Sequence, residues 1–94
     1  MSPDALDESL RALSHPERRT FFAACLHKRR AAGELAELSQ LSMATVSEHL
    51  KVLRKTGLVT LEKEGRFWFY RADRDRLAGI VAALARMSEA TRGA

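Results

Sequence analysis

Only one cysteine, Cys25, occurs among the 94 residues, and no apolar run is long. A single cysteine excludes an internal disulfide and is typical of a protein in a reducing cytoplasm. No segment approaches the roughly 18 consecutive apolar residues of a membrane-spanning helix. The acidic first four residues lead into no signal-peptide core. We therefore expect a cytoplasmic protein without a membrane segment.

The usual features of an enzyme are also missing from the sequence. We find no nucleophile beside a base, no glycine-rich phosphate loop and no converging carboxylates. The five glycines are scattered and mostly fall at expected turns. We predict that the protein is not an enzyme and uses no cofactor.

The length and charge of the chain bear on its number of domains and on the kind of partner that it binds. We assign residues 1–94 to one small domain, whose 46% hydrophobic content is enough to build a core. Lys and Arg number 16 against 12 acidic residues, which gives a net charge of +4. This excess suits nucleic acid, because counterion release dominates non-specific binding. Many inert small proteins are equally basic, so charge alone does not decide.

Residues 41–58 carry the start and stop signals of one helix, expected over about residues 43–55. Ser42 is a good N-cap, because its hydroxyl can accept from free amides of the first turn. Gly57 favours a left-handed stop, after which Leu58 can contact Leu53. The apolar residues of the helix repeat on one face. The opposite face has small and polar side chains first and cations last, as a helix in the major groove requires. An ordinary surface helix with cations at its C-terminus has the same pattern.

The next segment predicts a β-hairpin over residues 59–71. Residues 59–62 alternate in polarity, Glu64 and Gly65 form a turn signal, and residues 67–70 form an aromatic strand. With Glu64 and Gly65 as the loop, the expected pairs are Lys63–Arg66, Leu61–Trp68 and Val59–Tyr70. Trp68 is expected on the inner face, with Phe67 and Phe69 on the other. A groove-sized helix followed by a basic-tipped hairpin is a winged helix-turn-helix layout.

Four further helices complete the predicted fold, over residues 4–13, about 16–28, 31–39 and about 74–90. The fold class is mainly α with a β-hairpin wing, in the order four helices, two strands, one helix. The short third helix and the groove-sized helix form the helix-turn-helix pair. Ser14 or His15 caps the second helix, and Asp73 or Asp75 caps the last. Residues 91–94 are expected to be frayed.

Apolar stripes on the first and last helices predict a two-fold dimer surface. The stripe on the last helix is longer than one small core needs. Alternatively, both helices simply cover the core of a monomer. The residues assigned to the dimer interface are Leu6, Leu10, Leu13, Leu77, Ile80, Val81, Leu84 and Met87.

The groove-sized helix supplies most of the candidate DNA contacts. Candidates for base contacts are Met43, Ala44, Thr45, Ser47, Glu48 and His49. Candidates for phosphate contacts are Gln40, Ser42, Lys51, Arg54 and Lys55. Lys63 and Arg66 at the tip of the wing are candidates for the minor groove. The alternatives are a solvated Glu48, a solvated Arg66, and a His49 that lies at the edge of the core.

Two other features have simple structural interpretations. The basic cluster at residues 27–30 is best explained by cations stabilising the end of a helix, rather than by DNA contact. Cys25 shares the inward face of its helix with Phe21 and Phe22, so we expect an inert core thiol rather than a redox switch.

Taken together, these segments resemble the ArsR/SmtB family of bacterial winged-helix repressors. The resemblance covers about residues 10–84, with matches at residues 13–19, 34–36, 42, 45–53, 57–59, 64–66 and 70–71. Its most specific part is Thr45-Val46-Ser47, His49-Leu50 and Leu53, followed by Gly57-Leu58-Val59. The resemblance implies a homodimer that represses transcription from a palindromic operator and is released by an inducer. The sequence identifies no such small molecule.

The sequence departs from the metal-sensing members of that family. Those relatives carry a Cys-x-Cys pair in the third helix, and the matching positions here are Ala31 and Gly33. Others place Asp and His ligands on the last helix, where this chain has Arg76, Met87 and Ala90. We place His15, His27 and His49 on three different helices, whereas a metal needs converging donors. We predict no metal site.

The leading hypothesis is a dimeric DNA-binding repressor. The alternative is a winged-helix module that binds another protein through Phe67 and Phe69. Salt-dependent DNA binding would distinguish the two.

Overall fold

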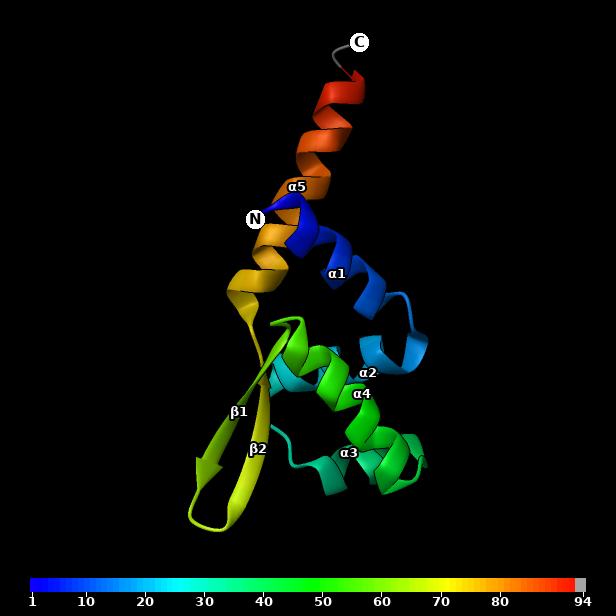
Figure 1. The fold of residues 1–94 in the computed structure, drawn as a ribbon, viewed down its shortest axis with the longest axis vertical. Helices are drawn as coiled ribbons and strands as arrows, with labels where there is room; N and C mark the ends of the chain where they lie inside the picture. The colour runs from blue at the N-terminus through cyan, green and yellow to red at the C-terminus, as the bar shows by residue number, and fades with distance from the viewer. Residues whose placement is uncertain (93–94) are drawn as a thin grey trace.

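The computed structural model describes residues 1–92 as five helices and a two-stranded antiparallel hairpin (Figure 1). The elements are α1 (Pro3–Leu13), α2 (Pro16–His27), α3 (Ala32–Ser39), α4 (Met43–Lys55), β1 (Val59–Glu64), β2 (Phe67–Ala72) and α5 (Arg74–Arg92). The predicted fold class, a mainly α winged helix-turn-helix, is confirmed. No helix of the described chain combines the length and apolar character needed to span a membrane.

The structure settles both open questions about helix caps. His15 caps α2, because its Nδ1 accepts from the backbone N–H of Glu17 at 3.3 Å. Asp73 caps α5, because its Oδ1 accepts from the backbone N–H of Arg76 at 3.0 Å. Helix α5 includes residues 91 and 92, which we expected to be frayed. Residues 93 and 94 of that expectation lie outside the described residues.

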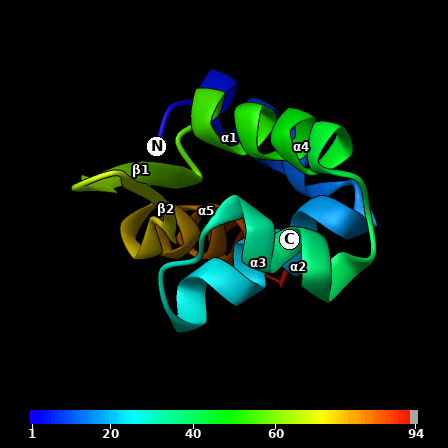
Figure 2. The ribbon, with the colours of Figure 1, turned by 90° about the horizontal axis from the view of Figure 1, so that it is seen from below.

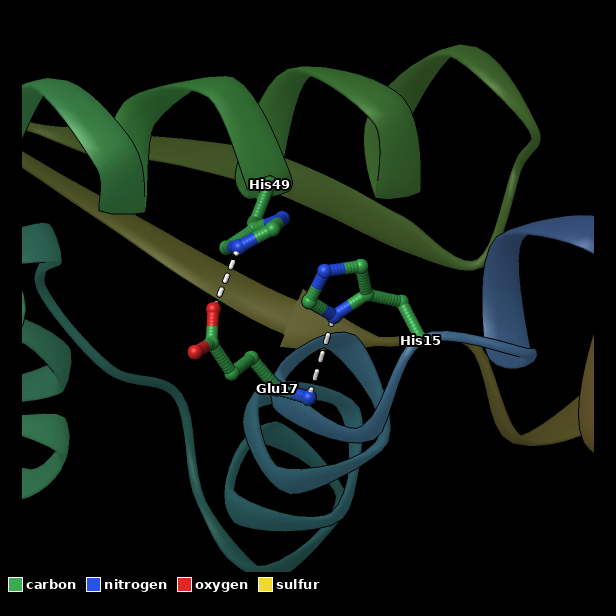
Figure 3. Close-up of side chains that lie close together, drawn as sticks. All are labelled: His15, Glu17 and His49. Carbon is green, nitrogen blue, oxygen red and sulfur yellow. Dashed lines mark hydrogen bonds and ion pairs between the residues drawn. The ribbon is translucent and has the colours of Figure 1, made fainter.

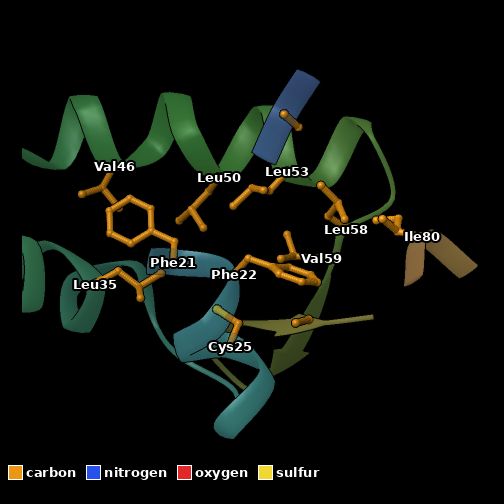
Figure 4. Packing of buried hydrophobic residues seen from close by; sticks show 12 residues of the cluster. Phe21, Phe22, Cys25, Leu35, Val46, Leu50, Leu53, Leu58, Val59 and Ile80 are labelled. Atoms are coloured by element: carbon orange, nitrogen blue, oxygen red, sulfur yellow. The ribbon is translucent and has the colours of Figure 1, made fainter. Parts of the chain in front are cut away.

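The core lies where α2, α4 and the base of the hairpin meet (Figure 4). Phe21 and Phe22 of α2 pack between the inner face of α4 and the segment at Leu58 and Val59. Two expectations need correction. The spacing of Leu35 and Leu38 in α3 predicts that both point inward, but Leu38 is 58% exposed. Ile80, assigned to a dimer interface, is only 4% exposed and belongs to the core of its own chain.

The predicted register of the hairpin is wrong by two residues. The observed partners are Val59↔Ala72, Leu61↔Tyr70, Lys63↔Trp68 and Glu64↔Phe67. The loop is therefore Gly65-Arg66 instead of Glu64-Gly65. The physical reason is the turn: Gly65 has φ +60°, and a two-residue turn with glycine in the first loop position suits the twist of a hairpin. Because the shift is even, no side chain changes face.

The hairpin, which we call the wing, is joined to the body at its base. Arg30 donates its N–H to the carbonyl of Tyr70 at 2.9 Å and accepts from the N–H of Tyr70 at 2.7 Å. At the other end of the molecule, α1 lies beside the first part of α5, whose C-terminal half extends away from the body (Figure 1). This projection makes the molecule elongated, with extents of 53 × 25 × 22 Å.

Candidate nucleic-acid interface

Local interactions fix both ends of α4. At its start, Ser42 Oγ accepts from the backbone N–H of Thr45 at 3.2 Å, as predicted. At its end, Gly57 has φ +78°, and the N–H of Leu58 bonds to the carbonyl of Leu53 at 2.9 Å. This 6→1 bond is that of a Schellman stop. The start and end of the helix therefore follow from the sequence signals that predicted them.

The two faces of α4 differ sharply in exposure. Val46, Leu50 and Leu53 are at most 1% exposed and pack against the core. The opposite face is open to solvent, and seen from below, α4 lies along one edge of the molecule with the wing projecting beside it (Figure 2). The exposed side chains on α4 include Met43, Ala44, Thr45, Ser47, Glu48, Lys51, Arg54 and Lys55. Gln40 and Ser42, just before the helix, are exposed as well.

His49 does not belong to this exposed face, so its assignment to base contacts needs correction. Its side chain is 11% exposed, and its Nε2 lies 2.7 Å from Glu17 Oε2 on α2. The ring also lies 5.9 Å from that of Phe21, centroid to centroid. His49 is thus the core-edge histidine that the sequence left open as an alternative.

The cations of α4 are not neutralised within the described chain. Lys51, Arg54 and Lys55 form no ion pair with a carboxylate among residues 1–92. They line an open cleft of about 410 Å³ together with Ser47 and Tyr70. Sequence reasoning missed Tyr70, because only the folded chain brings this residue of β2 to the cleft. The cleft combines positive charge with hydroxyl groups, which suits the phosphate backbone of a nucleic acid.

The tip of the wing carries Lys63 and Arg66, both exposed as predicted. Lys63 Nζ lies 5.5 Å from the centroid of the Trp68 ring, at cation–π range. Trp68 is 50% exposed, so its predicted place in the core is wrong. The reason is its place in the hairpin: Trp68 pairs with Lys63 close to the loop, and the loop end of the hairpin projects away from the helices (Figure 1).

Arg29, which follows α2 in the chain, binds the wing through its side chain. The sequence did not predict this contact. Its guanidinium pairs with Glu62 at 3.3 Å and also with Glu64, and it lies 4.2 Å from the centroid of Phe69. The other partner of Glu62 is Arg71, at 2.7 Å, and this hydrogen bond lowers the pKa of the Glu62 carboxyl. Arg29 therefore does not stabilise the end of α2 as we expected.

Arg30 does act at that helix end, because its Nε donates to the carbonyl of Ala24 at 3.2 Å. Cys25, on the same helix, is 1% exposed. Burial is the main cause that raises the pKa of its thiol to about 11. The thiol stays protonated at neutral pH, which agrees with an inert core cysteine.

Comparison with known proteins shows which family has this architecture. A family model described as a helix-turn-helix domain matches residues 13–62. The HTH-type transcriptional repressor SmtB of Mycobacterium tuberculosis is 38% identical over 78 residues, which is 83% of this chain and 58% of the relative. The transcriptional activator HlyU of Vibrio cholerae is 30% identical over 83% of this chain and 72% of the relative. This chain belongs to the ArsR/SmtB family of winged helix-turn-helix regulators.

Solved structures agree with this family membership. An ArsR-like transcriptional regulator from Rhodococcus sp. RHA1 has a TM-score of 0.87 and 27% identity, over 95% of this chain and 84% of that one. The chain spans 58% of SmtB, so the ArsR/SmtB relatives first matched are considerably longer. Proteins of this family are DNA-binding transcriptional regulators, which confirms the prediction that the chain is not an enzyme.

Proposed function

We propose that the protein is a dimeric, sequence-specific transcriptional regulator, most simply a repressor, that binds a palindromic operator in the cytoplasm. The observation that supports this most directly is the exposed face of α4. It presents short polar side chains at one end and unpaired cations at the other, while the opposite face anchors the helix in the core. We call α4 the recognition helix from here on.

The N-terminal half of the recognition helix is proposed to enter the major groove and read bases. Thr45 and Ser47 offer hydroxyls, and Glu48 can accept from the amino group of a cytosine. Met43 and Ala44 offer apolar contact to thymine methyl groups. Met43 is 50% exposed, which leaves its side chain free to make such a contact.

The C-terminal half is proposed to lie along the phosphate backbone. Lys51, Arg54 and Lys55 carry the charge, and the cleft that they line is open to solvent. Gln40 and Ser42 approach phosphates at the other end of the helix. In the wing, Lys63 and Arg66 are proposed to reach the minor groove, where arginine is favoured by the negative potential.

A second copy of the chain is proposed to cover α5 and α1. Val81, Leu84 and Met87 are between 42% and 61% exposed, on a helix that extends away from the body (Figure 1). Leu10 of α1 is also exposed, at 38%, whereas the other proposed interface leucines are partly buried against the core. A projecting helix with an uncovered apolar stripe is poorly stable alone, and a two-fold partner buries that stripe.

The test is a fluorescence anisotropy titration of the full chain with duplexes that tile the promoter region of its own gene. We expect one duplex to bind tightly, with an affinity that falls steeply with salt. Lys51→Ala should weaken binding to all duplexes and reduce the salt slope by roughly 1. Thr45→Ala should instead reduce the preference for that duplex over a scrambled one, and Arg66→Ala should weaken binding without unfolding the protein.

Arg86→Ala is a charge-matched control. Arg86 is exposed on the C-terminal half of α5, which extends away from the recognition helix and the wing (Figure 1). It should leave the affinity and the salt slope unchanged, once light scattering shows the same oligomeric state. Binding that is absent for every duplex, or equally weakened by Arg86→Ala, would overturn the proposal.

A second candidate function rests on the aromatic tip of the wing. Phe67 is 69% exposed and Trp68 is 50% exposed, which is unusual for side chains of this size. A protein-binding module would use this patch and leave the cations of the recognition helix without a partner. In that case Phe67→Ser abolishes co-purification of a stoichiometric partner protein, and no duplex is retained.

A further inference from the structure

Three potential metal ligands meet under the recognition helix, at a point that the proposed DNA contacts do not use (Figure 3). His15 precedes α2, Glu17 lies in the first turn of α2, and His49 comes from the inner side of α4. One donor atom of each residue lies within 4.8 Å of the donors of the other two. The two imidazole rings are 4.6 Å apart, centroid to centroid.

This arrangement corrects the expectation that the histidines lie apart on different helices. His15 and His49 come together because α2 packs directly against α4, with Phe21 beside the ring of His49. Only His27, exposed at the end of α2, stays outside the cluster. None of the three residues occupies the positions where metal-sensing relatives carry their ligands.

The hydrogen bond between Glu17 and His49 accounts for only part of the cluster. His49 Nε2 lies 2.7 Å from Glu17 Oε2. The Nδ1 of His15 accepts from the backbone N–H of Glu17. The other nitrogen of His15 lies on the side of its ring that faces His49, and no hydrogen bond within residues 1–92 uses it (Figure 3). This nitrogen of His15 is therefore a third potential donor beside the Glu17–His49 hydrogen bond, and it has no hydrogen-bond partner of its own among residues 1–92.

Two imidazoles and one carboxylate are a ligand set that zinc uses, with water in the fourth position. Bonds of about 2.0–2.2 Å in a tetrahedron place neighbouring donors roughly 3.3 Å apart. The observed donor separations, from 2.7 Å up to 4.8 Å, bracket that value. Small rotations of the side chains therefore suffice, and Glu17, whose side chain is 41% exposed, leaves a side open to water.

We propose that His15, Glu17 and His49 form a binding site for a divalent transition-metal ion, best suited to zinc. The ion links the start of α2 to the middle of α4. A metal-bound imidazole keeps its proton on the other nitrogen. His15 therefore gives up the hydrogen bond that caps α2, and coordination replaces the cap in holding the first turn in place.

The test uses the full chain, freed of metal with a chelator and without a histidine tag. Isothermal titration with Zn²⁺ should give one ion per chain, and Co²⁺ should give the strong visible absorption of a tetrahedral site. His15→Gln and His49→Gln should each lower the affinity roughly tenfold or more. His27→Gln removes an imidazole outside the cluster and should leave the affinity unchanged.

Thermal unfolding provides a second readout. Saturating Zn²⁺ should raise the Tm of the wild type and of His27→Gln, because a ligand that binds only the folded state stabilises it. The same concentration should raise the Tm of His15→Gln by clearly less, because the variant binds the ion more weakly. His15 is half-buried, so this variant can be checked for native circular dichroism even if the buried His49 proves essential for folding.

The proposal is overturned if the wild type binds no stoichiometric Zn²⁺. It is equally overturned if His15→Gln binds as tightly as the wild type, or if His27→Gln loses as much affinity as His15→Gln. No DNA is present in these measurements, so their failure leaves the proposed DNA-binding function untouched.

Discussion

The recognition helix and the wing are neighbours on one side of the molecule, yet they are held in place by different forces. Val46, Leu50 and Leu53 fix the helix by burial, each at most 1% exposed. The outer part of the wing instead has exposed aromatics and an exposed loop. Val59 and Ala72 bury the base of the wing in the core, and further out the wing is tied to the rest of the protein by the Arg30–Tyr70 backbone bridge and the ion pairs of Arg29.

This difference implies two kinds of rigidity. Burial of apolar surface does not depend on attraction between charges, so we expect the exposed face of the helix to keep its position when salt screens the surface charges. Exposed ion pairs are weak and screened by salt, so we expect the tip of the wing to be held less firmly than the helix. Regions with few buried contacts also open at lower free energy than the core.

The largest expected effect comes from breaking the anchor of the recognition helix. Leu50→Ala leaves a cavity at the centre of the core, where Leu50 is 1% exposed. We expect the free energy of unfolding to fall by about 2–5 kcal/mol, measured by urea denaturation followed by circular dichroism. The matched control is Lys51→Ala, one residue further along and exposed, which should change stability by roughly 0.5 kcal/mol or less. Equal losses in both variants would contradict a helix held by burial.

The same contrast explains how far the sequence predicted this protein. The signals of the recognition helix, such as Ser42 and Gly57, lie within a few residues of the contacts that they make, so they were readable. The hairpin loop depends on whether Gly65 takes the first or the second position, and both fit the same residues. The ties of Arg29 to Glu62 and the meeting of His15 with His49 join residues more than 30 positions apart. No local pattern records such contacts.

Among the proposed contact residues too, some were predictable from local sequence and others depend on contacts between distant parts of the chain. The exposed face of the recognition helix followed from its 3.6-residue period. His49 lies at the border of that face, where periodicity does not determine direction, and its bond to Glu17 decided its orientation. Tyr70 lines the cleft only in the folded chain, because it lies 15 or more positions from the cleft residues of the recognition helix.

The second prediction concerns stability at alkaline pH, which tests whether the Cys25 thiol is shielded from water in the core. The pKa of Cys25 is about 11 in the folded protein against an ordinary value of 9.0, mainly because of burial. The folded state therefore keeps a proton that the unfolded state loses. The resulting stabilisation is complete below pH 9 and is lost as the pH rises through about 11, on the order of 2 kcal/mol in total.

The measurement is urea denaturation of the wild type and of Cys25→Ala across this alkaline range. The variant is expected to have a flatter alkaline limb, while the titration of Lys and Tyr is common to both proteins. Stability curves that run parallel over the whole range would show that the thiol is not desolvated.

The third prediction compares alanine substitutions at two glycines with positive φ, one at the end of the recognition helix and one in the loop of the wing. Gly57, at the end of the recognition helix, has φ +78°, and an added Cβ would lie 2.5 Å from Arg76 Nη2. Gly65, in the loop of the wing, has φ +60° and nothing within 4 Å of an added Cβ. Alanine is strained in both conformations by about 1–2 kcal/mol. Gly57→Ala must also displace the guanidinium of Arg76, so it should lower the Tm more than Gly65→Ala. The reverse order would contradict the view that the wing is the less constrained region.

The smallest expected effect concerns Glu62, the carboxylate shared by Arg71 and Arg29. The hydrogen bond from Arg71 is the main cause that lowers the pKa of the Glu62 carboxyl. The ionised carboxylate therefore stabilises the folded protein above the ordinary pKa of 4.5, and this stabilisation is lost as the pH falls through the lowered pKa. Glu62→Gln should therefore reduce the Tm slightly at neutral pH and low salt. The melting curves of variant and wild type should converge in acid, and also at high salt, because the pairs are exposed and screened. A Tm difference that persists under both conditions would mean that Glu62 acts through packing, and the wing would then resemble the recognition helix more closely than its exposure suggests.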